Sequence, residues 1–89
     1  MANNQSTEKR IRQDVKRRER NRSARSEMRK SIKQLRGAVV AGDAQAAQEL
    51  LPGTLSLVDS TARKSIIHRN MAARTKSRLA RAVRALSDS

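Results

Sequence analysis

The spacing of apolar residues over residues 8–41 constrains the fold more than any other feature of this chain. The stretch has no proline and one glycine, Gly37, and it consists mostly of residues that favour helices. Its apolar residues recur at steps of four, four, three and four, at Ala24, Met28, Ile32, Leu35 and Val39. This spacing is one face of an α-helix. The sequence therefore predicts a first helix over about residues 8–41, with Ser6 or Thr7 as its N-cap.

A second helix is predicted over about residues 43–63. Gly42 can adopt the left-handed conformation that ends a helix, and Asp43 can cap the next one. The apolar positions of the second helix are Ala44, Ala47, Leu50, Leu51, Leu55, Val58 and Ala62. Pro52 lies in its middle and lacks a backbone donor, so we expect a kink or a short break there, with both halves still packed.

A third helix is predicted over about residues 69–86, after a boundary around residues 65–70. Ala72, Leu79, Val83 and Leu86 mark its apolar face. No stretch alternates long enough to propose a strand, so the expected fold is all-α, a three-helix bundle with a long, basic, protruding first helix. Residues 1–89 fit a single domain by length. The ends, residues 1–7 and 87–89, are expected to be flexible.

The charge of the chain falls into three blocks. Residues 1–36 carry a net charge of +9, residues 37–62 one of −3 and residues 63–89 one of +7, which gives +13 in total. This layout suits two basic elements side by side with the middle one behind them. A strongly basic small chain points to a polyanionic partner, most often nucleic acid.

The cations form continuous ridges on the predicted helices. A single charged stripe is more often merely solvated, but such a face normally interleaves acids with bases, whereas these ridges hold only cations. Arg outnumbers Lys in the chain, and guanidinium groups pair with phosphate oxygens bidentately. The first-helix ridge is Arg18, Arg22, Arg25, Arg29, Lys33 and Arg36, and the third-helix ridge is Arg74, Arg78 and Arg81.

The first half of the first helix has nothing to pack on within the chain. Ile11 and Val15 are its only large apolar residues. Clustered like charges weaken an isolated helix. We therefore expect residues 1–22 to be frayed in free solution and to become ordered on an anionic partner.

The absence of aromatic residues narrows the kinds of nucleic acid that we expect the chain to bind. Proteins that bind single strands usually stack bases on aromatic rings. Folded RNA and duplex DNA remain, recognised through their phosphates and shape. A small architectural DNA-binding protein is therefore the alternative to an RNA-binding one.

Other function classes are disfavoured by missing residue types. Without cysteine there is neither a disulfide framework nor a thiolate site. His68, the single histidine, is a poor metal ligand or general base by itself, so we expect no enzyme, no cofactor and no metal. The longest apolar run, residues 38–41, is far too short for a membrane span. Asn21, His68, Asn70 and Ser77 remain open between caps or surface residues and phosphate contacts.

Several segments resemble the bacterial small-subunit ribosomal protein S-twenty family. Residues 67–79, IHRNMAARTKSRL, are similar to its third-helix signature, and Ala41-Gly42-Asp43 to its first turn. Residues 1–3, 17–21 and 25–29 are similar to its N-terminal half, so the resemblance covers nearly the whole chain. Ser65 stands where many members have Gly.

The resemblance implies direct binding to the 5′ domain of small-subunit ribosomal RNA early in subunit assembly, in the cytoplasm. Other small-subunit ribosomal proteins are possible partners, whereas a membrane or a small-molecule substrate is not expected. The family contacts carry over to Arg17, Arg18, Asn21, Arg25, Arg29, His68, Arg69, Asn70, Arg74, Lys76 and Arg78. The basic faces and the hydroxyl at Ser77 add Lys9, Arg10, Arg12, Lys16, Arg22, Lys33, Ser77 and Arg81 to the predicted RNA-binding residues.

Overall fold

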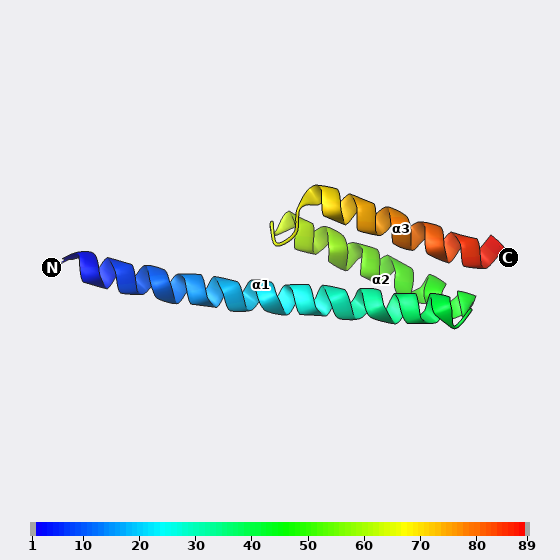
Figure 1. Cartoon of the computed structure of the whole chain (residues 1–89), viewed down its shortest axis with the longest axis horizontal. Coiled ribbons are helices and arrows are strands. Elements are labelled where there is room, and N and C mark those ends of the chain that lie inside the picture. Colours follow the sequence, from blue (N-terminus) through cyan, green and yellow to red (C-terminus); the bar gives the residue numbers. More distant parts are fainter. Residues whose placement is uncertain (1, 89) are drawn as a thin grey trace.

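The computed structural model consists of three α-helices (Figure 1). It describes the backbone of residues 2–88 and the side chains of residues 6–87. The helices are α1 (Ala2–Val40), α2 (Ala44–Arg63) and α3 (Arg69–Asp88), and the described residues form no strand. α2 folds back along the C-terminal half of α1, and α3 folds back along α2, so α1 and α3 run in the same direction. The expected three-helix bundle is confirmed.

The N-terminal half of α1 projects from the bundle as an arm (Figure 1). Every side chain from Ser6 to Arg20 is exposed, and Met28 is the first buried residue among the side chains described. The molecule therefore measures 69 Å along its longest axis but 21 Å and 15 Å across. The expected protruding helix is confirmed, but its predicted N-cap is wrong, because Ser6 and Thr7 lie inside α1. Residues 1 and 89, at the ends we expected to be flexible, lie outside the described residues.

The core consists of two small clusters stacked along the bundle. One contains Met28, Val58, Ile67 and Ala72, and the other contains Leu35, Ala47, Leu79 and Val83. Each cluster draws on more than one helix, and Ile32 packs against both. With no ring available, small aliphatic side chains from α1, α2 and α3 have to meet at each level.

Two threonines and one leucine of α2 depart from the predicted apolar face. Leu50 is 36% exposed, whereas Thr54 and Thr61 are each 2% exposed. The Thr54 hydroxyl donates to the Leu50 carbonyl oxygen at 2.9 Å, and the Thr61 hydroxyl donates to that of Leu57 at 2.7 Å. Because each hydroxyl is bonded to the preceding turn, it can be buried without an unsatisfied polar group.

α2 continues through Pro52 without a break, which differs from the short break that we considered. Pro52 and Gly53 are both exposed on the outer side of the helix. The residues on either side, Leu51, Thr54 and Leu55, face the bundle. Packing of both halves on α1 and α3 therefore holds one helix together despite the missing backbone donor.

Both turns between helices have the same hydrogen-bond pattern. After α1, the amide of Gly42 donates to the Val39 carbonyl oxygen at 3.1 Å and that of Asp43 to the Ala38 carbonyl oxygen at 3.0 Å. After α2, the amide of Ser65 donates to the Ala62 carbonyl oxygen at 2.9 Å, and that of Ile66 to the Thr61 carbonyl oxygen at 3.1 Å. These paired bonds define the Schellman motif.

The Schellman motif needs one residue with positive φ, and the two turns fill that position differently. Gly42 has a φ of 74° and Ser65 a φ of 62°, the one positive value of a non-glycine residue in the described chain. The expected left-handed role of Gly42 is confirmed, and so is the cap at Asp43, whose carboxylate accepts from the Ala46 amide at 3.1 Å. Ser65 adopts a conformation that glycine adopts more easily.

Candidate nucleic-acid interface

The cationic ridge of α1 lies beside its core-facing stripe. Successive residues on a helix are about 100° apart, so Arg29 and Arg36 each follow a buried residue, Met28 and Leu35, around the axis. All members of the ridge are exposed: Arg18, Arg22, Arg25, Arg29, Lys33 and Arg36. The core fixes the rotation of α1, and this ridge is thereby held outside the bundle.

The arm carries cations on several sides. Lys9, Arg12, Gln13 and Lys16 line one shallow hollow along a single face. Arg10 and Arg17 are exposed as well, whereas Asn21 is half-buried where the arm meets the bundle. Because no other element covers these cations, a polyanion can approach the arm from any side.

The ridge of α3 lies on the face of that helix opposite the core. Leu79 and Val83 point toward the core, and the polar side chains on the opposite side of the helix point outward. One open hollow of about 540 Å³ is lined by Asn70, Ala73, Arg74, Ser77, Arg78 and Arg81. The structure thus brings together five of the predicted site residues on α3. A hydroxyl, an amide and three guanidinium groups can all donate to phosphate oxygens there.

The two ridges meet at the C-terminal end of α1. The cluster that holds Leu35 and Leu79 brings α1 and α3 together directly. A hollow of about 310 Å³ there is lined by Arg36, Val39, Val40, Arg78, Leu79 and Ala82. Arg36 and Arg78, one from each ridge, therefore border the same groove. α2 carries Glu49 and Asp59 and no cation before Arg63, so it contributes little to this cationic surface.

Lys76 differs from the other predicted site residues because its charge is already paired. Its ammonium nitrogen lies 2.8 Å and 3.0 Å from the two carboxylate oxygens of Asp59 on α2. The side chains of Lys76 and Asp59 are 36% and 47% exposed. A phosphate would have to compete with Asp59 for this lysine. No sequence pattern indicates this pairing, because the two residues lie 17 positions apart on different helices.

His68 caps the N-terminus of α3. Its ring nitrogen Nδ1 accepts from the Asn70 amide at 3.1 Å, and its carbonyl oxygen accepts from the Ala72 amide at 3.1 Å. Of the readings left open for His68, the geometry therefore places it as a cap. Its Nε2 carries the proton when the ring is neutral, and the side chain is exposed, so that N–H remains available as a donor.

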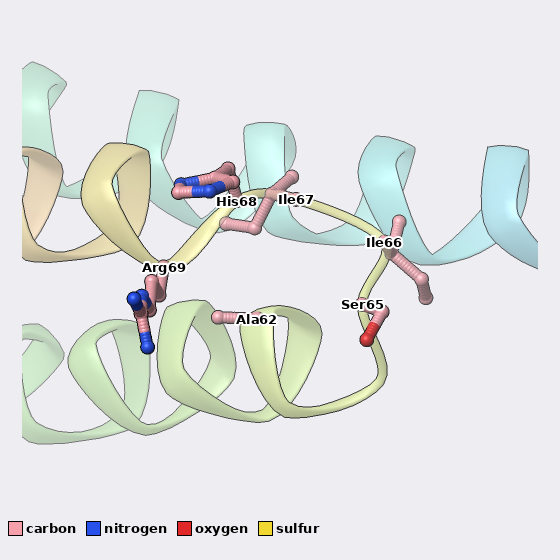
Figure 2. Close-up of a pocket in the computed structure, with 6 residues that line it drawn as sticks. All are labelled: Ala62, Ser65, Ile66, Ile67, His68 and Arg69. Atoms are coloured by element: carbon pink, nitrogen blue, oxygen red, sulfur yellow. The ribbon is translucent and has the colours of Figure 1, made fainter.

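The last residue of the loop, His68, and the first residue of α3, Arg69, direct their side chains to opposite sides (Figure 2). Figure 2 shows Arg69 extending toward α2, while the His68 ring lies on the other side of the loop. Together with Ala62, Ser65, Ile66 and Ile67 they line a hollow of about 420 Å³. Arg69 and Lys76 also line a second hollow with Asp59 and Arg63 between α2 and α3. Arg69 therefore lies apart from the row that runs from Asn70 to Arg81.

Sequence reasoning missed two residues of this surface. Val40 and Ala82 border the groove between α1 and α3. The apolar pattern alone gave them no role there. The neighbouring pair Val39 and Val40 was the available indication in the sequence. Two consecutive residues of a helix point in different directions, so the buried stripe accounts for only one of these valines. Among the described residues, no three His, Asp or Glu side chains gather into a metal site, and no helix is long and apolar enough to cross a membrane.

Comparison with known proteins decides the family. Residues 2–84 match the family model of ribosomal protein S20. The chain belongs to the ribosomal protein S20 family. Three S20 relatives, each named small ribosomal subunit protein bS20, support the assignment. That of Nitrosomonas eutropha is 49% identical over 86 residues, which cover 97% of this chain and 99% of the relative.

The other two S20 relatives are similar over the same extent. The protein of Bordetella pertussis is 51% identical over 87 residues, 98% of this chain and 100% of the relative. The protein of Azoarcus sp. is 49% identical over 87 residues, 98% of this chain and 99% of the relative. The resemblance seen in the third-helix segment and the first turn is therefore confirmed over nearly the whole chain.

Proposed function

We propose that this chain is a structural constituent of the small ribosomal subunit that binds small-subunit ribosomal RNA directly, in its 5′ domain, and supports assembly of the subunit. It acts in the cytoplasm and catalyses no reaction. The observation that carries the proposal is the pair of exposed, all-cationic ridges on α1 and α3. Membership in the S20 family, whose relatives are named as small-subunit proteins, supports the choice of RNA.

Binding follows from where the core places the cations. The apolar stripes of α1 and α3 are buried against α2 and against each other, which turns both arginine rows outward. Guanidinium groups neutralise phosphates and release counterions, so affinity falls steeply with salt concentration. Ser77 and Asn70 supplement the arginines with neutral donors on the same face of α3. The ridges of α1 and α3, with Asn70 and Ser77 beside the second, act together as one phosphate-binding surface.

Lys76 and His68 take secondary roles in this proposal. Lys76 contributes to RNA binding only when the RNA displaces Asp59 from its ammonium group. His68 fixes the start of α3 through its Nδ1 and offers its Nε2–H to the RNA. The arm, with Lys9, Arg12 and Lys16 along one face, extends the contact beyond the bundle.

Chemical footprinting of small-subunit ribosomal RNA, with and without the protein, tests the proposal. Protection confined to the 5′ domain is the expected result. Protection absent or scattered over the whole RNA would refute it. The alternative, an architectural DNA-binding protein, shares the basic surface, so competition at equal salt separates the two. Fragments of the ribosomal RNA should displace duplex DNA, and the reverse order of affinity would favour the DNA-binding function.

A further inference from the structure

The groove between Arg36 and Arg78 differs from the rest of the cationic surface because its floor is apolar. Its other lining residues are Val39, Val40, Leu79 and Ala82, and none of the six is acidic. Val40 is 88% exposed, the largest exposure of any large hydrophobic residue in the described chain. Single exposed apolar residues are common on protein surfaces. An apolar hollow bordered by a guanidinium from each of two ridges is a more specific feature.

We propose that this groove holds one unpaired nucleotide of the bound RNA. The base packs on the aliphatic floor, and the guanidinium planes of Arg36 and Arg78 stack on it. This inference rests on the proposed function and adds the structure of the RNA that is recognised. Bases of single-stranded RNA positions are commonly stacked on aromatic rings or on arginine. The chain has no aromatic residue, so arginine is the stacking group it can offer.

The charge around the groove favours a nucleotide over other occupants. A second copy of this chain would bring another net charge of +13 against the same arginines, which disfavours self-association. An RNA held by the two ridges is already adjacent to the groove, so its bases are present at high effective concentration. Covering Val40 and the floor removes apolar surface from water, which favours a base with its apolar faces over a bare phosphate.

The test compares two RNA duplexes that differ by one unpaired nucleotide. Direct titration of the full chain should show about tenfold tighter binding of the bulged duplex, a value in the lower half of the range that stacking of a base on an aromatic side chain contributes. The Arg78→Lys variant keeps the charge but loses the planar group, and Ala82→Leu fills the floor of the groove. Ala82→Leu should lose the preference and still bind the paired duplex. Arg78→Lys should lose the preference too, and because Arg78 also belongs to the α3 ridge, the ratio of its affinities for the two duplexes is the readout.

A matched control lies on the same helix. Arg84 is exposed on α3 and does not border the groove, so Arg84→Lys should keep the tenfold preference. Helical content measured by circular dichroism shows whether the Ala82→Leu variant folds. If it does not fold, Arg78→Lys, a substitution at an exposed position, still tests the inference.

Three results would overturn the inference. Equal affinity of the wild-type protein for the two duplexes would do so while leaving RNA binding intact. Survival of the preference in Arg78→Lys would also do so. The third is a dimer in sedimentation that Val40→Asp disrupts, because the groove would then hold a second copy. Failure to bind either duplex or ribosomal RNA would instead refute the proposed function.

Discussion

The hydroxyl oxygens of Ser31 on α1 and Thr54 on α2 lie 3.0 Å apart. Thr54 has one hydroxyl proton and donates it to the Leu50 carbonyl oxygen at 2.9 Å. Ser31 is therefore the donor of the bond between the helices. This short chain of hydrogen bonds is the polar link between α1 and α2 at the level of Pro52, where α2 lacks a backbone donor of its own.

Thr54→Val should destabilise the bundle by about 1 kcal/mol, because it keeps the shape of the side chain but removes both hydrogen bonds. Urea unfolding followed by circular dichroism measures the change. In the double variant Thr54→Val and Ser31→Ala, the loss of stability should be smaller than the sum of the two single losses, since the two residues share one interaction. Ser56→Ala, an exposed position of α2, serves as the control. Additive losses would show that the hydroxyls act independently.

Ser65→Gly should stabilise the protein by about 0.5–1 kcal/mol. Positive φ disfavours a side chain, and this gain exceeds the extra freedom that glycine has in the unfolded chain. Gly42→Ala should have the opposite sign, because it places a Cβ in the same left-handed conformation. Thermal unfolding compares the two, with a shift of several degrees for each kcal/mol expected in a domain of this size. A lower melting temperature for Ser65→Gly would contradict the conformational explanation.

Arg29→Ala should make RNA affinity less dependent on salt. The slope of log affinity against log salt concentration should become shallower by roughly 0.9, the value for one phosphate contact on a duplex. Lys30 is the matched control, since it is the next residue, also exposed, and lies off the ridge. Lys30→Ala should change the slope much less. The double variant Arg25→Ala and Arg29→Ala should flatten the slope further without unfolding the bundle. Equal slopes for Arg29→Ala and Lys30→Ala would show that the ridge faces only water.

Asp59→Asn should strengthen RNA binding, because it releases the ammonium group of Lys76. Glu49→Gln, also on α2, changes the net charge by the same amount without a partner in α3 and provides the comparison. Both variants are measured at low salt. The gain in RNA affinity of Asp59→Asn beyond that of Glu49→Gln is the contribution of Lys76. Stability should fall by at most about 1 kcal/mol, the usual range for a partly exposed pair. Identical affinities would mean that Lys76 does not reach the RNA.

The arm should gain helix when RNA binds. Every side chain of residues 6–20 is exposed and the segment carries clustered cations, so burial within the bundle does not stabilise this part of the helix. Circular dichroism of the full chain should therefore show greater helicity with ribosomal RNA than without it, after subtraction of the RNA signal. A chain starting at residue 22 should show little change. Unchanged helicity in the full chain would indicate an arm that is already ordered.

Much of the fold could be predicted from local pattern. The stripe from Ala24 to Val39 and the Gly42-Asp43 turn depend on the helical repeat and on backbone preferences that neighbouring residues determine. The family resemblance also rested on local segments. The N-cap was wrong because α1 begins at Ala2, before both candidate residues. Thr54 and Thr61 were missed because only the bonds to the preceding turn make a buried threonine favourable.

The sequence by itself determined the three helices, the sides of α1 and α3 that carry cations, and the excess of those cations over acids, since each depends on residues within a few turns. Only the tertiary structure decided which charges meet. It placed Arg36 beside Arg78 around one groove and paired Lys76 with Asp59. These neighbours are set by how far one helix slides along another, and that register depends on the packing of Leu35, Val58 and Leu79 rather than on any local repeat.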